Sequence, residues 1–246
     1  MERERVPTGI PGLDDILYGG LMRGDMVLVQ GTPGAGKTTL GLQFIHEGIV
    51  RYGEPGLVVT FEEVPDQLYR DALNFGWDLR RLSQEGKLRV IPTSPSVFRQ
   101  QIESSQGLIW RSLYEMGVQR VLIDSITHFN RITSDPVELR ELVNQVLNLL
   151  RQGELTAFLV GEVGTGPTPG WQFEEYVVDA VIRLSYEWVG DHVRRRFLEV
   201  VKARGQDFLS GKHVFCFEES GIRVYPTPRP LPLEPRRGRP LPPWSG

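Results

Sequence analysis

The chain has little of three things: cysteine, lysine and long apolar stretches. Its one cysteine, Cys216, excludes an internal disulfide, and because it lies in the apolar run HVFCFEE we expect a buried strand thiol. No stretch approaches the ~18 to 20 consecutive apolar residues of a membrane span, and the charged start MERERVPTG does not resemble a signal peptide. These features predict a cytoplasmic protein with no membrane partner.

The charge balance gives no global reason to expect a polyanionic partner. The formal net charge of the 246 residues is −3, so composition does not favour nucleic-acid binding. Only four of the 28 basic residues are lysines, so a lysine that falls within a motif is informative. The sequence also has no Cys/His cluster of the kind that binds metals.

The order of apolar runs predicts an α/β fold. Strands are expected over 25–31, 56–63, 88–93, 120–126 and 156–162, and helices over 37–53, 66–76, 97–116 and 136–152. Strands that alternate with helices of this length indicate a mainly parallel sheet with helices on both faces.

The rhythm changes after Val177. Strands over 180–188, 194–205 and 213–225 follow one another with short links, which indicates an antiparallel C-terminal extension of the sheet. The last stretch, residues 226–246, is rich in proline and arginine and is predicted to be an extended, disordered tail. We therefore expect one domain over residues 1–225 and a tail.

A glycine-rich segment, GTPGAGKT at residues 31–38, matches the pattern GxxxxGK[ST] between an apolar strand and an amphipathic helix. Its glycines let the backbone curl so that successive amide hydrogens point inward, beside the positive end of the following helix. Such a turn is a cage for polyphosphate, in which Lys37 contacts the β- and γ-phosphates and the Thr38 hydroxyl coordinates Mg²⁺. The residues predicted to surround the phosphates are Gly31, Thr32, Pro33, Gly34, Ala35, Gly36, Lys37, Thr38 and Thr39.

Phosphoryl transfer also needs carboxylates, and two apolar strands end in them. Asp124 ends the run RVLID, at the sheet edge where ligands gather, and is predicted to join Thr38 in the magnesium shell, directly or through water. Glu62 and Glu63 end the run VVTFEE and could polarise an attacking water. Because adjacent strand side chains point to opposite faces, only one of them would face the γ-phosphate, and the spacing does not decide which.

With these motifs, the chain resembles the KaiC-like branch of the RecA superfamily of ATPases. The resemblance covers residues 6–225 and rests on PTGIPGLDDILYGGLMRGDMVLVQGTPGAGKTTLGLQF, FEE, IDSIT and KARG. It implies a RecA-type P-loop core with ATP and Mg²⁺ as ligands, and Glu62 and Glu63 as the catalytic carboxylate pair. It also implies a homo-hexameric ring with nucleotide between subunits.

The run RRRFLEVVKARGQ matches the family segment that reaches the γ-phosphate of the neighbouring subunit. Lys202 and Arg204 stand at the corresponding positions. Residues two apart in a strand share a face, so both cations could converge on one anion. The alternative interpretation is an edge strand protected by surface charge.

Two departures from the family bear on function. In FEEYVVDAV, Glu175 and Tyr176 stand where one branch of the family carries a phosphorylated Ser-Thr pair, so autokinase activity is not expected. The segment GEVGTGPTPGW, residues 161–171, is predicted to be a mobile loop on a central channel. It opens with Glu162, which resembles a nucleotide-sensing position.

Three functions remain open at this point. The favoured one is Mg-dependent ATP hydrolysis that changes the conformation of a ring with a regulatory or signalling role. The second is a docking module that holds ATP with little turnover and takes an unknown protein partner through the tail over 226–246. The third is a RadA-like repair or recombination ATPase, in which Trp171 and Phe173 stack on single-stranded bases, and the net acidity counts against it.

Overall fold

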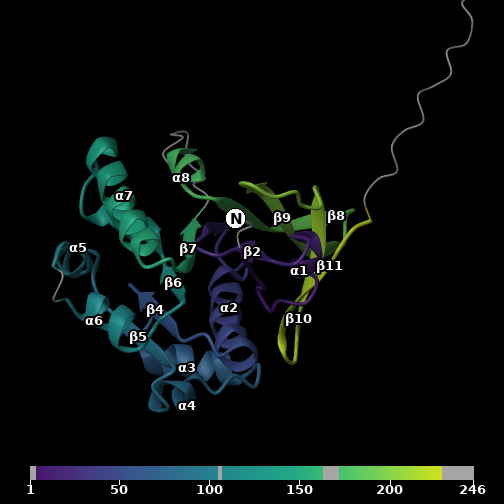
Figure 1. Ribbon diagram of the computed structural model, residues 1–246. Coiled ribbons are helices and arrows are strands. Elements are labelled where there is room, and N and C mark those ends of the chain that lie inside the picture. Colours follow the sequence, from purple (N-terminus) through teal and green to yellow (C-terminus); the bar gives the residue numbers. More distant parts are fainter. Residues whose placement is uncertain (1–3, 105–106, 163–171, 229–246) are drawn as a thin grey trace, which may run out of the picture.

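A nine-stranded sheet runs through the molecule (Figure 1). The structure is a computed structural model that describes residues 4–104, 107–162 and 172–228. The strands of the sheet are β3 (Met26–Gly31), β4 (Gly56–Thr60), β5 (Leu88–Pro92), β6 (Arg120–Asp124), β7 (Thr156–Glu162), β8 (Ala180–Val189), β9 (Val193–Ala203), β10 (Lys212–Glu218) and β11 (Gly221–Tyr225). They lie in the order β11-β10-β9-β8-β3-β7-β6-β4-β5. A separate ribbon pairs β1 (Arg5–Val6) with β2 (Leu21–Met22).

The pairing of the strands confirms the predicted fold class. Strands β8, β3, β7, β6, β4 and β5 pair in parallel, whereas β9, β10 and β11 continue the sheet in antiparallel pairs. Every residue of β3 and β4 is buried, as expected for parallel strands that are covered on both faces. The carboxyl ends of the parallel strands, where β3 ends at Gly31 and β6 ends at Asp124, form what we call the loop edge. The opposite edge, where β3 begins at Met26 and β8 begins at Ala180, is the far edge.

Helices cover the two faces of the sheet with separate apolar cores. One face carries α1 (Leu13–Ile16), α2 (Lys37–Tyr52), α3 (Pro65–Leu73) and α4 (Leu79–Gln84), and the other carries α5 (Pro95–Glu103), α6 (Leu108–Glu115), the 3₁₀ helix η1 (Ile126–Arg131) and α7 (Pro136–Gln152). The short helix α8 (Gln172–Val177) precedes β8. In the first core the rings of Phe44 and Phe158 stack with their centroids 4.1 Å apart. None of the helices in the described part of the chain is long and apolar enough to cross a membrane.

Local chemistry explains where the helices begin and end. Helix α2 starts after Gly36, which has φ 103°, and stops at Gly53, which has φ 67°. Both angles lie in the left-handed region that glycine adopts without strain. Helix α7 begins with the Asp135 side chain accepting from the Val137 N–H, and Pro136 occupies the first helical position.

Three expectations from the sequence are wrong. The single strand expected over 213–225 is a hairpin of two strands, β10 and β11. The single helix expected over 97–116 is two helices, α5 and α6, and a Cβ added at Gly107 would lie 2.6 Å from the Gln101 carbonyl oxygen. Cys216 is exposed, because Phe215 of β10 faces the core and the next side chain of a strand points the other way.

A fully buried arginine ties the N-terminal segment to the sheet. The Arg120 guanidinium donates to the Glu54 carboxylate at 2.6 Å and to the carbonyl oxygens of Pro7 and Phe44 at 2.9 and 3.0 Å. Burial lowers the pKa of Arg120, and the charge of Glu54 acts in the opposite direction. Glu54 also accepts from Arg23 at 2.8 Å, so this buried charge group is well paired.

Candidate functional site

The glycine-rich turn joins β3 to α2 at the loop edge. Gly34 and Gly36 have φ angles of 76° and 103°, and the Ala35 N–H donates to the Thr32 carbonyl oxygen at 3.1 Å. Gly31 must lack a side chain, because an added Cβ would lie 2.4 Å from the Leu184 carbonyl oxygen. The exposed turn therefore stands at the N-terminus of α2, a position that suits an anion.

Lys37 is buried against this turn. Its ammonium donates to the carbonyl oxygens of Gly31 and Thr32 at 3.0 and 3.1 Å. Burial lowers the pKa of Lys37, while the charges of Glu162 and Asp124 act in the opposite direction. Glu162, at the end of β7, thus belongs to the electrostatic surroundings of the turn.

Thr38 and Asp124 bring together the two predicted magnesium ligands. The Thr38 hydroxyl donates to Asp124 Oδ2 at 2.6 Å, so the first turn of α2 meets the end of β6. Burial raises the pKa of Asp124, and the hydrogen bond from Thr38 and the charge of Lys37 oppose that rise. Hydroxyl and carboxylate oxygens are the ligands that Mg²⁺ takes in nucleotide sites.

The two neighbouring glutamates lie beyond the end of their strand. Because β4 ends at Thr60, strand alternation does not decide where Glu62 and Glu63 point. Two contacts hold the backbone that follows β4. The Phe61 N–H donates to the Asp124 carbonyl oxygen at 3.0 Å, and the Thr60 hydroxyl lies 3.1 Å from both the N and O atoms of Glu63.

Glu62 and Glu63 have different surroundings. Glu63 lines a cleft of about 130 Å³ beside Thr38 and Thr39. Burial raises the pKa of Glu63, and the nearby charges of Asp124, Asp71 and Glu62 add to that rise. Glu62 is 61% exposed and pairs instead with two basic side chains of η1.

A family profile described as the KaiC ATPase matches residues 6–229. The chain belongs to the KaiC family of ATPases. Circadian clock oscillator proteins KaiC from Synechococcus elongatus and Thermostichus vulcanus are 37% and 36% identical over 230 and 233 residues. These matches cover 90% and 92% of the chain but 44% and 45% of the relatives, so the chain spans less than half of their length.

A solved structure of the KaiC type agrees with the fold. The KaiC-like protein of Pyrococcus horikoshii superposes with a TM-score of 0.81 at 31% identity, covering 92% of this chain and all of that one. The predicted RecA-type core and the single KaiC domain are therefore confirmed.

Lys202 and Arg204 lie at the far edge of this KaiC-family domain. The register pairs Gly31 with Leu184 at the loop edge and Ala180 with Ala203 at the far edge. The two cations that flank Ala203 are therefore on the side of the sheet away from the turn of their own chain.

The two cations come together on the C-terminal turn of α8. Lys202 donates to the carbonyl oxygens of Glu175 and Val178 at 2.6 and 2.7 Å, and Arg204 donates to that of Tyr176. Burial and the charge of Arg204 lower the pKa of Lys202. The pairing of β8 with β9 is regular from Lys202 to Ala203, and the Arg204 N–H continues it by donating to the Asp179 carbonyl oxygen at 2.8 Å. The two cations, two residues apart, therefore lie on one face, as strand alternation predicts.

Phe217 is a neighbour of the turn that the motifs did not indicate. A Cβ added at Gly36 would lie 2.8 Å from its ring. The guanidinium of Arg196 stands 4.9 Å from the Phe217 ring centroid and 4.5 Å from that of Tyr186. The alternation of β10, with Phe215 and Phe217 two apart, is the signal that both rings share the core face.

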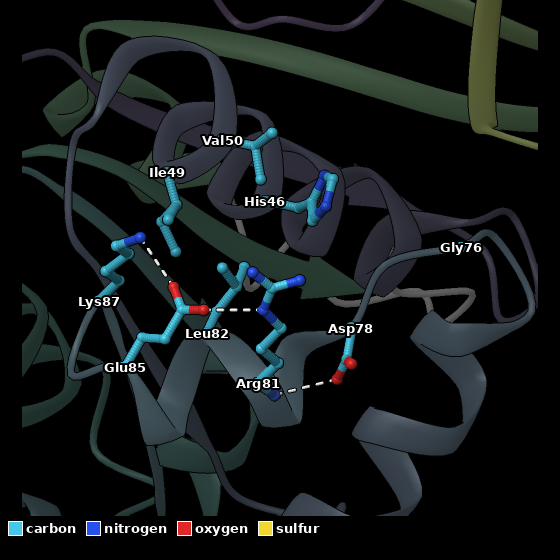
Figure 2. A pocket seen from close by; sticks show the side chains of 9 residues that line it. All are labelled: His46, Ile49, Val50, Gly76, Asp78, Arg81, Leu82, Glu85 and Lys87. Atoms are coloured by element: carbon cyan, nitrogen blue, oxygen red, sulfur yellow. Dashed lines mark hydrogen bonds and ion pairs between the residues drawn. The ribbon is translucent and has the colours of Figure 1, made fainter.

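A hollow of about 350 Å³ opens between α2 and α4 (Figure 2). It begins nine residues along α2 from Lys37, roughly 13 Å at the rise of an α-helix. Glu85 accepts from Arg81 and from Lys87, both at 2.7 Å, so the two cations that line the hollow are already paired. We assign no nucleotide role to this hollow.

Two predicted features lie largely outside the described residues. They are the central-channel loop predicted over 161–171, of which 163–171 with Trp171 are outside, and the tail predicted over 226–246, of which 229–246 are outside. Their roles remain predictions.

Proposed function

We propose that the chain binds MgATP and hydrolyses its γ-phosphate bond within a homo-hexameric ring that has a regulatory or signalling role. The single observation that carries this proposal is the 2.6 Å hydrogen bond between Thr38 and Asp124 beside the glycine-rich turn. It places a hydroxyl and a carboxylate together at a helix N-terminus, which is the arrangement that a magnesium-bound triphosphate needs.

The donor set fits Mg²⁺ when phosphates complete it. Among the described residues no group of three or more His, Cys, Asp or Glu side chains could hold a metal ion by themselves. Thr38 and Asp124 would supply two oxygens, with Asp124 acting directly or through water, and the nucleotide would supply others. The bound ion would neutralise charge on the β- and γ-phosphates.

The chain's own groups then have distinct tasks. Backbone N–H groups of the turn over 31–39, apart from Pro33, which has none, bind the phosphates, and Lys37 exchanges its two carbonyl partners for phosphate oxygens. Glu62 or Glu63 accepts the proton of the attacking water, because both follow β4 at the loop edge. These roles are supported by the position of each residue around the turn.

The far-edge position of Lys202 and Arg204 supports a ring. The two cations lie at the end of the sheet away from their own glycine-rich turn. The γ-phosphate that they would reach is therefore the one bound at the turn of a neighbouring protomer. Each site would then be completed by two protomers. We also retain the division into an ATPase domain over 1–225 and a tail over 226–246, and the expected lack of autokinase activity.

Phosphate release and oligomeric mass test this proposal. Lys37→Ala should abolish MgATP hydrolysis, whereas Lys87→Ala, which removes a lysine paired with Glu85 in Figure 2, should leave it unchanged. The mass with MgATP should rise to that of a hexamer in wild type. Equal phosphate release by wild type and Lys37→Ala would overturn the hydrolytic proposal.

The same measurements separate the alternatives. Tight ATP binding that depends on Lys37, with no phosphate release, would support the nucleotide-dependent docking module. Salt-sensitive retention on single-stranded DNA would support the RadA-like function, and no retention at low salt would exclude it.

A further inference from the structure

The backbone around Glu62 is fixed on both sides. The preceding residue, Phe61, donates its N–H to the carbonyl oxygen of Asp124 at 3.0 Å. The following residue, Glu63, is held through its N and O atoms by the Thr60 hydroxyl. The Glu62 Cα is therefore anchored to the end of β6, while its side chain, 61% exposed, still has free torsions.

Two basic side chains of η1 limit the torsions of the Glu62 side chain, and His128 does so more firmly. His128 Nε2 lies 3.1 Å from Glu62 Oε1, and Arg131 lies 3.5 Å from the same oxygen. The His128 side chain is only 11% exposed, its ring centroid stands 6.2 Å from that of Phe61, and the His128 backbone N–H donates to the Ser125 carbonyl oxygen at 3.2 Å. Arg131 is 65% exposed and therefore holds its partner less firmly.

The contacts divide the two oxygens of the Glu62 carboxylate. Both basic groups approach Oε1, and the described residues give Oε2 no partner. The imidazole belongs to η1, which is joined by Ser125 alone to Asp124 at the end of β6, so the side chain that contacts Glu62 lies one short helix away from the predicted magnesium ligand. The described residues give Glu63 no basic side-chain partner of this kind, and Glu63 lies in the cleft beside Thr38.

We propose that His128 is a positioning residue that holds Glu62 through Oε1 and thereby presents Oε2 to the attacking water. This inference rests on the proposed ATP hydrolysis, because it assigns a task within that reaction. His128 does not touch nucleotide in this arrangement and acts only through Glu62. It also distinguishes the two glutamates: Glu62 is the one whose direction is set by a largely covered ring.

Steady-state kinetics test the inference. His128→Phe keeps a ring beside Phe61 but removes the N–H, and it should lower kcat on the order of 10- to 100-fold with little change in KM. His128→Gln restores an N–H donor and should recover most of kcat. His192→Phe, at an exposed position in the β8–β9 turn, is the matched control and should behave as wild type.

A double-mutant cycle separates positioning from a purely structural role. In a Glu62→Gln background, His128→Phe should cause no further loss of kcat, because the residue it positions is already inactive. A loss of equal size in both backgrounds, or an unchanged kcat in His128→Phe, overturns the inference.

A spectroscopic measurement tests the contact without turnover. The chain has four histidines, so selective ring ¹⁵N labelling gives a short set of signals. The Nε2 resonance of His128 should shift in Glu62→Gln, while those of His46, His192 and His213 stay in place. An unmoved His128 resonance overturns the inference even if the wild type hydrolyses ATP. Absent hydrolysis together with a shifted resonance instead refutes the proposed function and leaves the Glu62–His128 contact established.

Discussion

The ring of Phe217 lies so close to Gly36 that an added Cβ would stand 2.8 Å from it. Strand β10, nearly at the end of the described chain, thus supports the turn that precedes α2. This contact ties the antiparallel extension of the sheet to the candidate phosphate site.

Substitution at two glycines of the turn should separate backbone strain from steric contact. A Cβ added at Gly34 meets nothing within 4 Å. Gly34→Ala should therefore lower the unfolding free energy only by the strain of the left-handed conformation, about 1–2 kcal/mol. Gly36→Ala also pushes on Phe217 and should lose more stability and more ATP affinity. Chemical denaturation and nucleotide titration measure both.

Adding Phe217→Leu to each glycine variant tests whether the Phe217 ring causes the extra loss in Gly36→Ala. It should recover part of what Gly36→Ala loses and nothing of what Gly34→Ala loses. Equal recovery in both backgrounds would show that Phe217 is not the obstacle.

Breaking the buried charge group at Arg120 should destabilise the whole domain. Arg120→Met leaves Glu54 buried with only Arg23 as partner, and the expected loss is about 3–5 kcal/mol of unfolding free energy. Urea denaturation measures the loss. The double variant Arg120→Met/Glu54→Leu should be less damaged than Arg120→Met alone, and additive losses would contradict the pairing.

Glu63 should make stability depend on pH. Burial raises its pKa above 4.5 in the folded chain, so folding favours the protonated form. The stability that Glu63 contributes in its protonated form is present below pH 4.5 and is lost as the pH rises through the folded pKa. Nucleotide-free Glu63→Gln should therefore be more stable than wild type at neutral pH, and the gain should vanish below pH 4.5.

Thermal or urea denaturation across pH 4 to 8 checks this expectation. Glu62→Gln is the control, since that exposed side chain contributes an ion pair of little weight. A stability gain in Glu63→Gln that is equal at all pH values would contradict the assigned cause.

Mixing two inactive variants should restore activity if sites are shared. Lys37→Ala keeps its far-edge cations, and Arg204→Ala keeps its glycine-rich turn, so some interfaces of a mixed ring contain both intact halves. At equal mixing, roughly a quarter of wild-type phosphate release is expected for random hexamers. No recovery after confirmed subunit exchange would show that the halves do not act across protomers.

Local patterns sufficed for the parallel core and the glycine-rich turn. Apolar runs set β3, β4, β6 and β7, and the expected bounds of α7, 136–152, agree with the structure. The meeting of Thr38 with Asp124 also followed, because strand ends of a parallel sheet share an edge.

Features that depend on distant contacts could not be predicted in this way. The break between α5 and α6 arises where Gly107 packs on Gln101, and the exposure of Cys216 depends on which face of β10 meets the core. His128 was missed because its partner, Glu62, is joined to it only by the pairing of β4 with β6.

The placement of Lys202 and Lys37 at opposite ends of the sheet's strands has a consequence for enzymology. Under the proposed mechanism a lone protomer has both the glycine-rich turn and the far-edge cations but cannot bring the two together. Turnover per chain would then fall on dilution, so the abundance of the protein itself would set how fast each copy works.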